Sequence, residues 1–306
     1  MFIFLIRRLF QIIPVLIGVS LIVFLIMQMV PGDPAALVAG EGATNEQVEA
    51  IRHDLGLDQP LYVQYFQYVG DVVKGDFGES IRTSRPVLDE ILARLPITIE
   101  LAFWSIVITI VLGILAGIIA ATKQNSFTDV GVMITSLIGV SLPNFWLGII
   151  LILYFSVGLH WFPVAGWGSF SHVILPAITL GTGGAAIVAR MTRSSMLEVI
   201  RQDYIRTARA KGVRERFIIY KHALKNALIP VVTVVGLQFG ALLGGTVITE
   251  SVFAINGVGR LIVDAIRMSD LPLVQGSILF VSVLFIIVNL LVDISYRLLN
   301  KRVELN

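Results

Sequence analysis

Residues 9–30 read LFQIIPVLIGVSLIVFLIMQMV and contain no charged side chain. A helix rises about 1.5 Å per residue, so about 20 apolar residues cross the hydrocarbon core of a bilayer. The run is longer than the apolar core of a secretory signal peptide, which has about 7–15 residues. The sequence Pro31-Gly32-Asp33-Pro34 that follows is also a poor cleavage site. We therefore predict a retained transmembrane helix.

Five further apolar stretches have the length of a membrane span. They cover residues 97–121, 131–158, 173–191, 227–249 and 274–296. Backbone groups cannot remain unpaired in lipid, so each stretch is predicted to be a helix. Pro143 and Pro176 interrupt two of these stretches and are expected to kink or end their helices. The predicted fold class is an all-α integral membrane protein with about six transmembrane helices.

The overall composition supports this class and excludes others. The mean hydropathy is +0.86, with 56% hydrophobic and 14% charged residues, whereas roughly a quarter of the residues of soluble domains are charged. A net charge of +2 gives no electrostatic basis for general nucleic-acid binding. The absence of cysteine excludes disulfides, thiolate metal sites and a thiol nucleophile.

Basic residues are distributed unevenly between the two sides of the predicted membrane. If the amino terminus lies in the cytoplasm, sixteen of the 23 lysine and arginine residues fall on the inner side. Ten of them lie within residues 190–225. Because cytoplasmic loops carry an excess of lysine and arginine, we expect both termini to be cytoplasmic. The segment 31–96 then lies outside.

The outer segment, residues 31–96, carries eleven acidic residues and two amphipathic stretches. Residues 44–55 are predicted to form a helix that begins with a capping box between Thr44 and Gln47. Residues 61–73 are predicted to form a second helix, rich in tyrosine and phenylalanine. Such aromatic residues suit a small lid at the membrane interface, and they equally suit a docking surface or vestibule for a delivered ligand.

The inner segment, residues 192–226, is predicted to form a protruding elbow. It contains nine basic and three acidic residues. Residues on one predicted helical face recur every four positions, at Met196, Ile200, Tyr204 and Ala208. Gly212 then separates this amphipathic helix from a second short helix. The segment is long for a plain connection, and its small residues favour contact with a partner surface over attachment to anionic lipid.

The run from Tyr204 to Gly212, YIRTARAKG, carries a family resemblance. It resembles the Glu-Ala-Ala loop of bacterial ABC importer permeases, and Ala208 and Gly212 match that pattern. Arg206 and Thr207 stand where the general pattern has Glu and Ala, as they do in the dipeptide, oligopeptide and nickel subfamily. The run HALKNALIP at residues 222–230 also agrees with that subfamily, whereas Asn256 replaces a proline that its members usually have.

The resemblance covers essentially the whole chain and implies a type I ABC importer permease. It implies a second homologous permease, two ATP-binding subunits and an extracytoplasmic substrate-binding protein as partners, in the plasma membrane of a bacterium or archaeon. Peptides are the expected substrate, with glutathione-like molecules and nickel complexes left open. The expected organisation is an N-terminal helix with the outer segment, residues 1–96, followed by a five-helix core, residues 97–306.

The same resemblance assigns eight residues to coupling with the ATPase subunits. They are Tyr204, Arg206, Thr207, Ala208, Arg209, Ala210, Lys211 and Gly212. No G-x-x-x-x-G-K-[ST] loop occurs, and the run Gly181-Thr182-Gly183-Gly184 lacks the lysine that reaches a nucleotide's phosphates. We therefore expect a transport subunit without an ATP site, in which ATP and magnesium bind to the partners. The four scattered histidines predict no metal site.

Polar and small residues within the apolar stretches are candidates for a translocation path and for helix packing. The polar ones are Glu100, Asn144, Gln238, Glu250, Asn289 and Asp293. Of these, Asn144, Gln238 and Glu250 are the predicted path residues, because polar groups at such depth usually face a cavity or partner. Glu100 and Glu250 lie near outer ends, where simple solvation also explains them. Gly236, Gly240 and Gly244 predict close packing, either against the second permease or within this chain.

An ion-gradient-driven secondary transporter of small polar solutes is the alternative function. That class predicts inverted repeats and paired broken helices, and the sequence shows no such repeat. An intramembrane enzyme would need a convergent catalytic set, which the sequence does not contain. The importer permease is the favoured interpretation.

Overall fold

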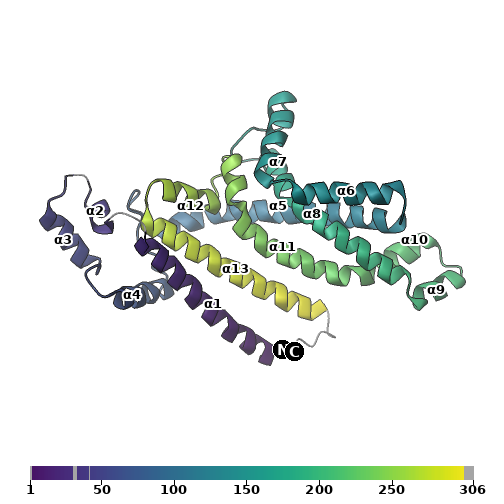
Figure 1. Cartoon of the computed structure of the whole chain (residues 1–306), viewed down its shortest axis with the longest axis horizontal. Helices are drawn as coiled ribbons and strands as arrows, with labels where there is room; N and C mark the ends of the chain where they lie inside the picture. The colour runs from purple at the N-terminus through teal and green to yellow at the C-terminus, as the bar shows by residue number, and fades with distance from the viewer. Residues whose placement is uncertain (1, 30–32, 41, 300–306) are drawn as a thin grey trace. The chain divides into compact units, whose positions relative to one another are not determined.

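The structure, a computed structural model, describes residues 2–29, 33–40 and 42–299 (Figure 1). Within these ranges the regular secondary structure is helical, apart from an isolated bridge between Glu79 and Pro86. The helices of the first third are α1 (Phe2–Met29), α2 (Pro34–Ala39), α3 (Asn45–Asp54), α4 (Leu61–Val73) and α5 (Val87–Thr122). They are followed by α6 (Phe127–Ser141), α7 (Asn144–Leu151), α8 (Phe170–Ile200), α9 (Asp203–Ala210), α10 (Glu215–Phe217), α11 (Leu224–Val252), α12 (Val258–Arg267) and α13 (Leu271–Leu299). Two further segments are π-helical, η1 (Ile152–Gly158) and η2 (Ile218–Ala223).

Among the described residues, five helices are long and apolar enough to cross a membrane, and a bent pair provides a sixth candidate. The five are Phe10–Met29, Val87–Thr122, Phe170–Ile200, Glu215–Leu242 and Leu271–Val292. The sixth is α6 followed by α7 and η1, with a bend of 104° between its halves. All six predicted spans are thus represented by helices.

The two interrupting prolines behave differently. At Pro143, the preceding Leu142 is extended, with ψ at 127°, and α7 begins directly after the proline. A proline disfavours the helical conformation in the residue before it, so the predicted stretch 131–158 is two helices that meet at an angle. Pro176, in contrast, lies inside α8, which continues through it.

Local sequence signals in the outer segment predict its helices well. The Thr44 amide donates to Gln47 Oε1 at 2.9 Å, and the Gln47 amide donates to Thr44 Oγ1 at 3.4 Å. The predicted capping box is therefore confirmed, and α4 has the predicted bounds. Helix α5 begins earlier than the apolar stretch at residue 97, because its first turns are amphipathic. They bury Val87 and Ile91 while Glu90 pairs with Arg94.

The chain divides into two compact units, and the first consists of residues 1–96 and 257–286. Its core contains Val87, Ile91, Val258, Leu261, Ala265, Leu273 and Val274. Asp270, 1% exposed, accepts a 2.5 Å hydrogen bond from Ser80 and further bonds from the amides of Ile81 and Arg82. Residues 257–286 therefore pack with the amino-terminal segment, in addition to the 1–96 region that the sequence suggests.

The second unit consists of residues 97–256 and 287–306, and α8 is its central helix. Helix α8 packs against α6, α7 and α11. Glycines allow it to approach α5 closely. A Cβ atom on Gly113 would lie 2.6 Å from Val188 Cβ, and one on Gly117 would lie 2.5 Å from Thr192 Cβ. Thr109 of α5 also donates a hydrogen bond to the Gly181 carbonyl of α8 at 3.0 Å.

Candidate functional site

The predicted elbow, residues 192–226, is shorter in the structure, because α8 continues to Ile200 and α11 begins at Leu224. The elbow, from here on residues 201–223, protrudes beyond the ends of these two helices (Figure 1). Helix α9 ends in a turn at Gly212, which has φ at 76°. The Val213 amide donates to the Ala208 carbonyl at 3.2 Å, and the Gly212 amide donates to the Arg209 carbonyl at 2.9 Å. This pair of bonds is a Schellman motif, whose left-handed position is usually glycine because a Cβ atom is disfavoured there. The elbow therefore has a defined shape at its tip.

A small apolar core holds the elbow against the helix ends. Its fully or almost fully buried residues are Ala121, Met196, Ile205, Ile218, Ala223 and Ala227, drawn from α5, α8, α9, η2 and α11. Ile205 is the one residue of α9 that is buried. Burial of a side chain of this kind contributes about 1.5–3 kcal/mol. Ile205 thus anchors α9, Ala208 packs beside it, and the other residues of the helix face outward.

The predicted amphipathic stripe is confirmed at Met196, Ile200 and Ala208, which form or pack against the elbow core, and is wrong at Tyr204. Helix α8 ends at Ile200, and α9 begins only at Asp203 after a non-helical Gln202. This break resets the helical rotation, so the face that continues from Met196 passes through Ile205. Tyr204, which the stripe placed on the buried face, is 44% exposed. Its hydroxyl instead accepts a 2.7 Å hydrogen bond from the amide of Asn226.

Seven of the eight predicted coupling residues are exposed. They are Tyr204, Arg206, Thr207, Arg209, Ala210, Lys211 and Gly212. Ala208 differs, because it is half-buried against the apolar core of the elbow. Ala210 and Gly212 are therefore the small residues of this stretch that leave room for a close approach from outside.

Some charged side chains of the elbow form ion pairs with one another. Arg209 makes two hydrogen bonds to Glu215, at 3.0 and 2.6 Å, across the Gly212 turn. The Glu215 carboxylate raises the pKa of the Arg209 guanidinium, which stays charged. Arg206 lies 3.4 Å from Asp203, with both side chains largely exposed. Lys211 has no ion pair among the described residues, and the same holds for Arg201, Arg214, Arg216 and Lys221, so these cations remain available.

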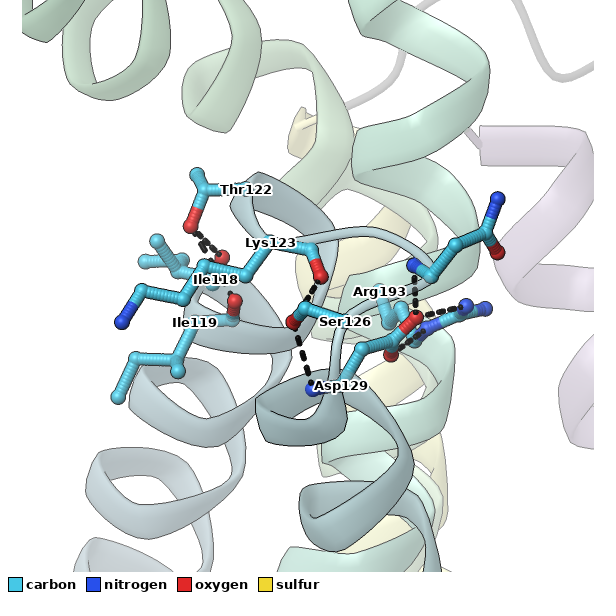
Figure 2. Close-up of polar contacts among 8 residues, drawn as sticks. Ile118, Ile119, Thr122, Lys123, Ser126, Asp129 and Arg193 are labelled. Atoms are coloured by element: carbon cyan, nitrogen blue, oxygen red, sulfur yellow. Dashed lines mark hydrogen bonds and ion pairs between the residues drawn. The ribbon is translucent and has the colours of Figure 1, made fainter.

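A buried ion pair lies at the same end of α8 (Figure 2). Asp129, at the start of α6, is 3% exposed and accepts hydrogen bonds from Arg193 Nε at 2.6 Å and Arg193 Nη2 at 2.7 Å. Ser126 caps α6 by accepting from the Asp129 amide at 3.3 Å, and the Asn125 amide donates to the Asp129 carboxylate at 3.0 Å. The pair ties the α5–α6 turn to α8 three residues before Met196, where the elbow core begins.

Sequence reasoning did not single out this pair. An isolated aspartate at the edge of an apolar stretch and an arginine near the end of another were the available signals. Two charges that flank different spans on the same predicted side are candidates for pairing, because neither is stable in lipid alone.

The predicted path residues lie in different surroundings. Glu250 is fully buried near the end of α11 and accepts a 2.8 Å hydrogen bond from Thr98 Oγ1 of α5. The interpretation that Glu250 is solvated is therefore wrong, whereas Glu100 is exposed. Gln238 is half-buried, and Asn144 is exposed at the first residue of α7. The structure does not bring these residues together into one cluster.

The glycine stripe of α11 packs within this chain. A Cβ atom on Gly236 would lie 2.3 Å from Val292 Cγ1, and one on Gly240 would lie 2.7 Å from Asn289 Oδ1. Both neighbours belong to α13, so these two glycines allow α11 and α13 to approach closely. The side-chain surroundings of Gly244 and of Asp293 lie outside the described residues.

Comparison with known proteins decides the family. The profile described as "Binding-protein-dependent transport system inner membrane component" matches residues 113–305, and the N-terminal profile of the same transport system matches residues 1–102. The chain belongs to this permease family. It is a multi-pass inner-membrane subunit of an ATP-binding-cassette importer, and a transport subunit rather than an enzyme.

Named relatives of this permease cover its full length. It is 48% identical over 301 residues to the glutathione transport system permease protein GsiC of Escherichia coli strain K12, with 98% of each chain covered. The same identity and coverage are found for GsiC of Shigella dysenteriae serotype 1, strain Sd197. Family membership excludes the alternative of an ion-gradient-driven transporter.

Solved structures of two ABC transporters share the fold of this permease. The inward-facing MetNI methionine ABC transporter matches with a TM-score of 0.62 at 20% identity, covering 71% of this chain and all of that chain. An amino acid ABC transporter with histidines matches with a TM-score of 0.52 at 15% identity, covering 70% and 94%. The predicted type I importer permease fold is therefore confirmed.

Proposed function

We propose that this permease forms, with a second homologous permease, the membrane path for short peptides, glutathione-like peptides among them. The observation that carries the substrate class is the 48% identity to glutathione permeases over 98% of both chains. In this proposal two ATP-binding subunits hydrolyse ATP with magnesium, and an extracytoplasmic binding protein delivers the peptide. The permease itself contributes the path and the surface that receives the ATPase.

The elbow is the proposed ATPase-coupling surface. Three features support it: the Schellman turn at Gly212, the buried apolar anchor at Ile205 and the exposed small residue Ala210. A rigid protrusion moves with the ATPase as a body, so that motion passes to α8 and α11. Its anchoring core also includes Ala121 of α5, which extends the connection to a third helix.

The proposed orientation has both termini in the cytoplasm, with the elbow inside and the segment 31–96 outside. The excess of basic residues in 190–225 supports it. Within the membrane, Gln238 and Asn144 stay candidates for the path, and the buried bond from Thr98 favours a positioning role for Glu250 between α5 and α11.

Transport and co-purification together test this function. The importer is expressed in cells that lack other peptide importers, and uptake of labelled glutathione and dipeptides is measured with the tagged permease purified from the same membranes. We expect ATP-dependent uptake and recovery of the ATP-binding subunits. Uptake of neither peptide, with an intact complex, would contradict the substrate class.

A matched pair of variants tests the coupling surface. Ala210→Trp places a large side chain on the exposed face of the elbow, and we expect it to reduce recovery of the ATPase subunits. Ala50→Trp makes the same change on an exposed position of α3 and is expected to leave that recovery unchanged. Equal recovery with both variants would remove the elbow from the ATPase contact.

Single cysteines test the orientation in this cysteine-free chain. Gln47→Cys in the outer segment is expected to react with an impermeant thiol reagent in intact cells. Arg214→Cys in the elbow is expected to react only after the membrane is opened. Labelling of position 214 in intact cells would reverse the proposed topology.

A further inference from the structure

The first unit contains a cavity of about 660 Å³ that none of the assignments above uses. Helix α1 contributes Phe24, Met27 and Gln28, and helix α4 contributes Gln64, Gln67, Tyr68 and Asp71. The end of α3 and the turn after it cover the cavity with residues 53–57 and Gln59, and Gln275 completes it from α13. Binding sites for small molecules occupy about 300–1,000 Å³. The cavity is therefore large enough for a molecule the size of a short peptide.

The lining is unusual in its amide content. Five of its residues are glutamines, namely Gln28, Gln59, Gln64, Gln67 and Gln275. A carboxamide offers both donors and an acceptor without a charge, which matches the donor and acceptor of a peptide group. A membrane-facing groove for lipid tails would present apolar side chains instead.

Gln64 makes the hydrogen bonds that hold the walls of the cavity together. Gln64 donates to the carbonyls of Leu57 at 3.2 Å and Gln59 at 2.8 Å, which holds the covering turn onto α4. Its amide oxygen accepts from Gln28 at 3.2 Å, which links α4 to α1. Tyr65 of the same helix contacts Ser20 of α1 at 2.9 Å. The walls are therefore fixed by polar contacts before any ligand binds.

Other polar groups of the lining are open to a ligand. The side chains of Gln59 and Gln67 line the cavity and are exposed. The Tyr68 hydroxyl is buried and lies beyond ordinary hydrogen-bond distance of any partner among the described residues. Burial raises the pKa of this phenol more than the nearby Gln275 lowers it, so the group stays a neutral donor. A buried hydroxyl without a partner costs free energy that a bound ligand would recover.

The charges at the cavity have one sign. Asp54 and Asp71 line it, and no lysine or arginine does. Asp71 lies 3.2 Å from Lys74, whereas Asp54 has no ion pair among the residues that the structure describes. An unpaired carboxylate beside a set of amides favours a ligand that has amide groups and a cationic amine at one end.

We propose that this cavity binds short peptides, with amide groups paired to Gln67, Gln275 and Tyr68 and the free amino group directed to Asp54. The proposal rests on the peptide-import function and adds a residence site for the peptide on this chain. In the proposed orientation the site lies on the outer side, where a delivered peptide arrives. It gives the outer segment a ligand-binding role of its own.

Protection of a single cysteine tests the proposal in membranes that contain the complete importer. Gln67→Cys lies in the cavity, and Tyr62→Cys lies on the same helix, exposed and outside it. The labelling rate of each with a maleimide is measured on this chain, with and without trialanine or S-methylglutathione, which carry no thiol. Because Gln67→Cys removes one proposed contact, we expect labelling at position 67 to slow about threefold at a peptide concentration of about twice the dissociation constant of this variant. Labelling at position 62 should not change.

Two further arms test the direction of the peptide. N-acetyl-trialanine lacks the amino group, and Asp54→Asn removes the carboxylate, so each is expected to weaken the protection at position 67. Equal protection by the acetylated and free peptides would overturn the role of Asp54. Gln275→Cys, on a different helix, repeats the measurement and guards against a local defect in α4.

The outcomes separate this inference from the import function. Peptide uptake by the wild-type importer, with no protection at positions 67 and 275 at any peptide concentration, overturns the cavity as a binding site and leaves the import function intact. Protection by trialanine without any peptide uptake supports the cavity and contradicts the import function.

Discussion

The guanidinium of Arg193 on α8 holds the carboxylate of Asp129 on α6 through two hydrogen bonds of 2.6 and 2.7 Å. The aspartate is 3% exposed, and the two residues are separated by 64 positions in the sequence. Two parallel charge-assisted bonds fix both distance and angle. The pair thus sets how the α5–α6 turn meets α8 directly before the elbow.

Removal of either charge should destabilise the chain strongly. Arg193→Gln leaves the buried Asp129 carboxylate without its partner, which typically costs about 3–5 kcal/mol, and Asp129→Asn should cost less because Arg193 is a quarter exposed. The double variant should cost clearly less than the sum of the two. The fraction of the purified importer that stays monodisperse after heating measures this effect. Arg206→Gln, which removes an exposed pair worth about 0–1 kcal/mol, is the control. Additive losses in the double variant would show that the pair is not coupled.

The turn at Gly212 should tolerate few substitutions. A β-branched residue is strongly disfavoured at φ 76°, whereas asparagine visits this region more readily. We expect Gly212→Val to abolish peptide uptake while the chain is still inserted at normal levels. Gly212→Asn should retain most of the uptake. Uptake is measured at equal membrane amounts of each variant, and normal uptake by Gly212→Val would separate the turn from coupling.

A methyl group at Gly117 should disrupt the contact between α5 and α8. Its Cβ would lie 2.5 Å from Thr192 Cβ and 2.7 Å from the Ala189 carbonyl, so a helix must shift. Overpacking of this kind typically costs about 1–3 kcal/mol. Gly131→Ala on α6 meets nothing within 4 Å and should be neutral or slightly stabilising. Thermal stability of the two alanine variants gives the comparison, and a stable Gly117→Ala would mean that α5 and α8 do not approach so closely.

Substitutions at Ile205 and Tyr204 should affect the stability of the elbow differently. Ile205→Ala empties a fully buried position of the elbow core and is expected to cost about 2–5 kcal/mol, seen as increased proteolysis within the elbow. Tyr204→Phe removes only the hydroxyl bonded to Asn226 and should leave the elbow protected. Equal protease susceptibility of the two variants would show that Tyr204 belongs to the buried face of the elbow, as the sequence predicted.

Features that depend on near neighbours in the chain were predictable. The capping box at Thr44 and the bounds of α4 follow from local hydrogen bonding and helical period. The break at Gly212 likewise follows from the conformational freedom of glycine. The exposure of Tyr204 was not predictable in the same way, because no strong local signal marks the break between α8 and α9 at Arg201 and Gln202.

The sequence by itself determined that this chain lies in a membrane, because apolar runs of sufficient length have no other stable environment. It also determined the positions of the spans and, through YIRTARAKG, the family. Only the tertiary structure decided which helices are neighbours, and several roles depend on that. Gly236 and Gly240 face α13, and Glu250 is buried against Thr98. Asp129 of α6 pairs with Arg193 of α8. Helical periodicity defines the faces of one helix, whereas the partner of each face is set by packing between segments far apart in the chain.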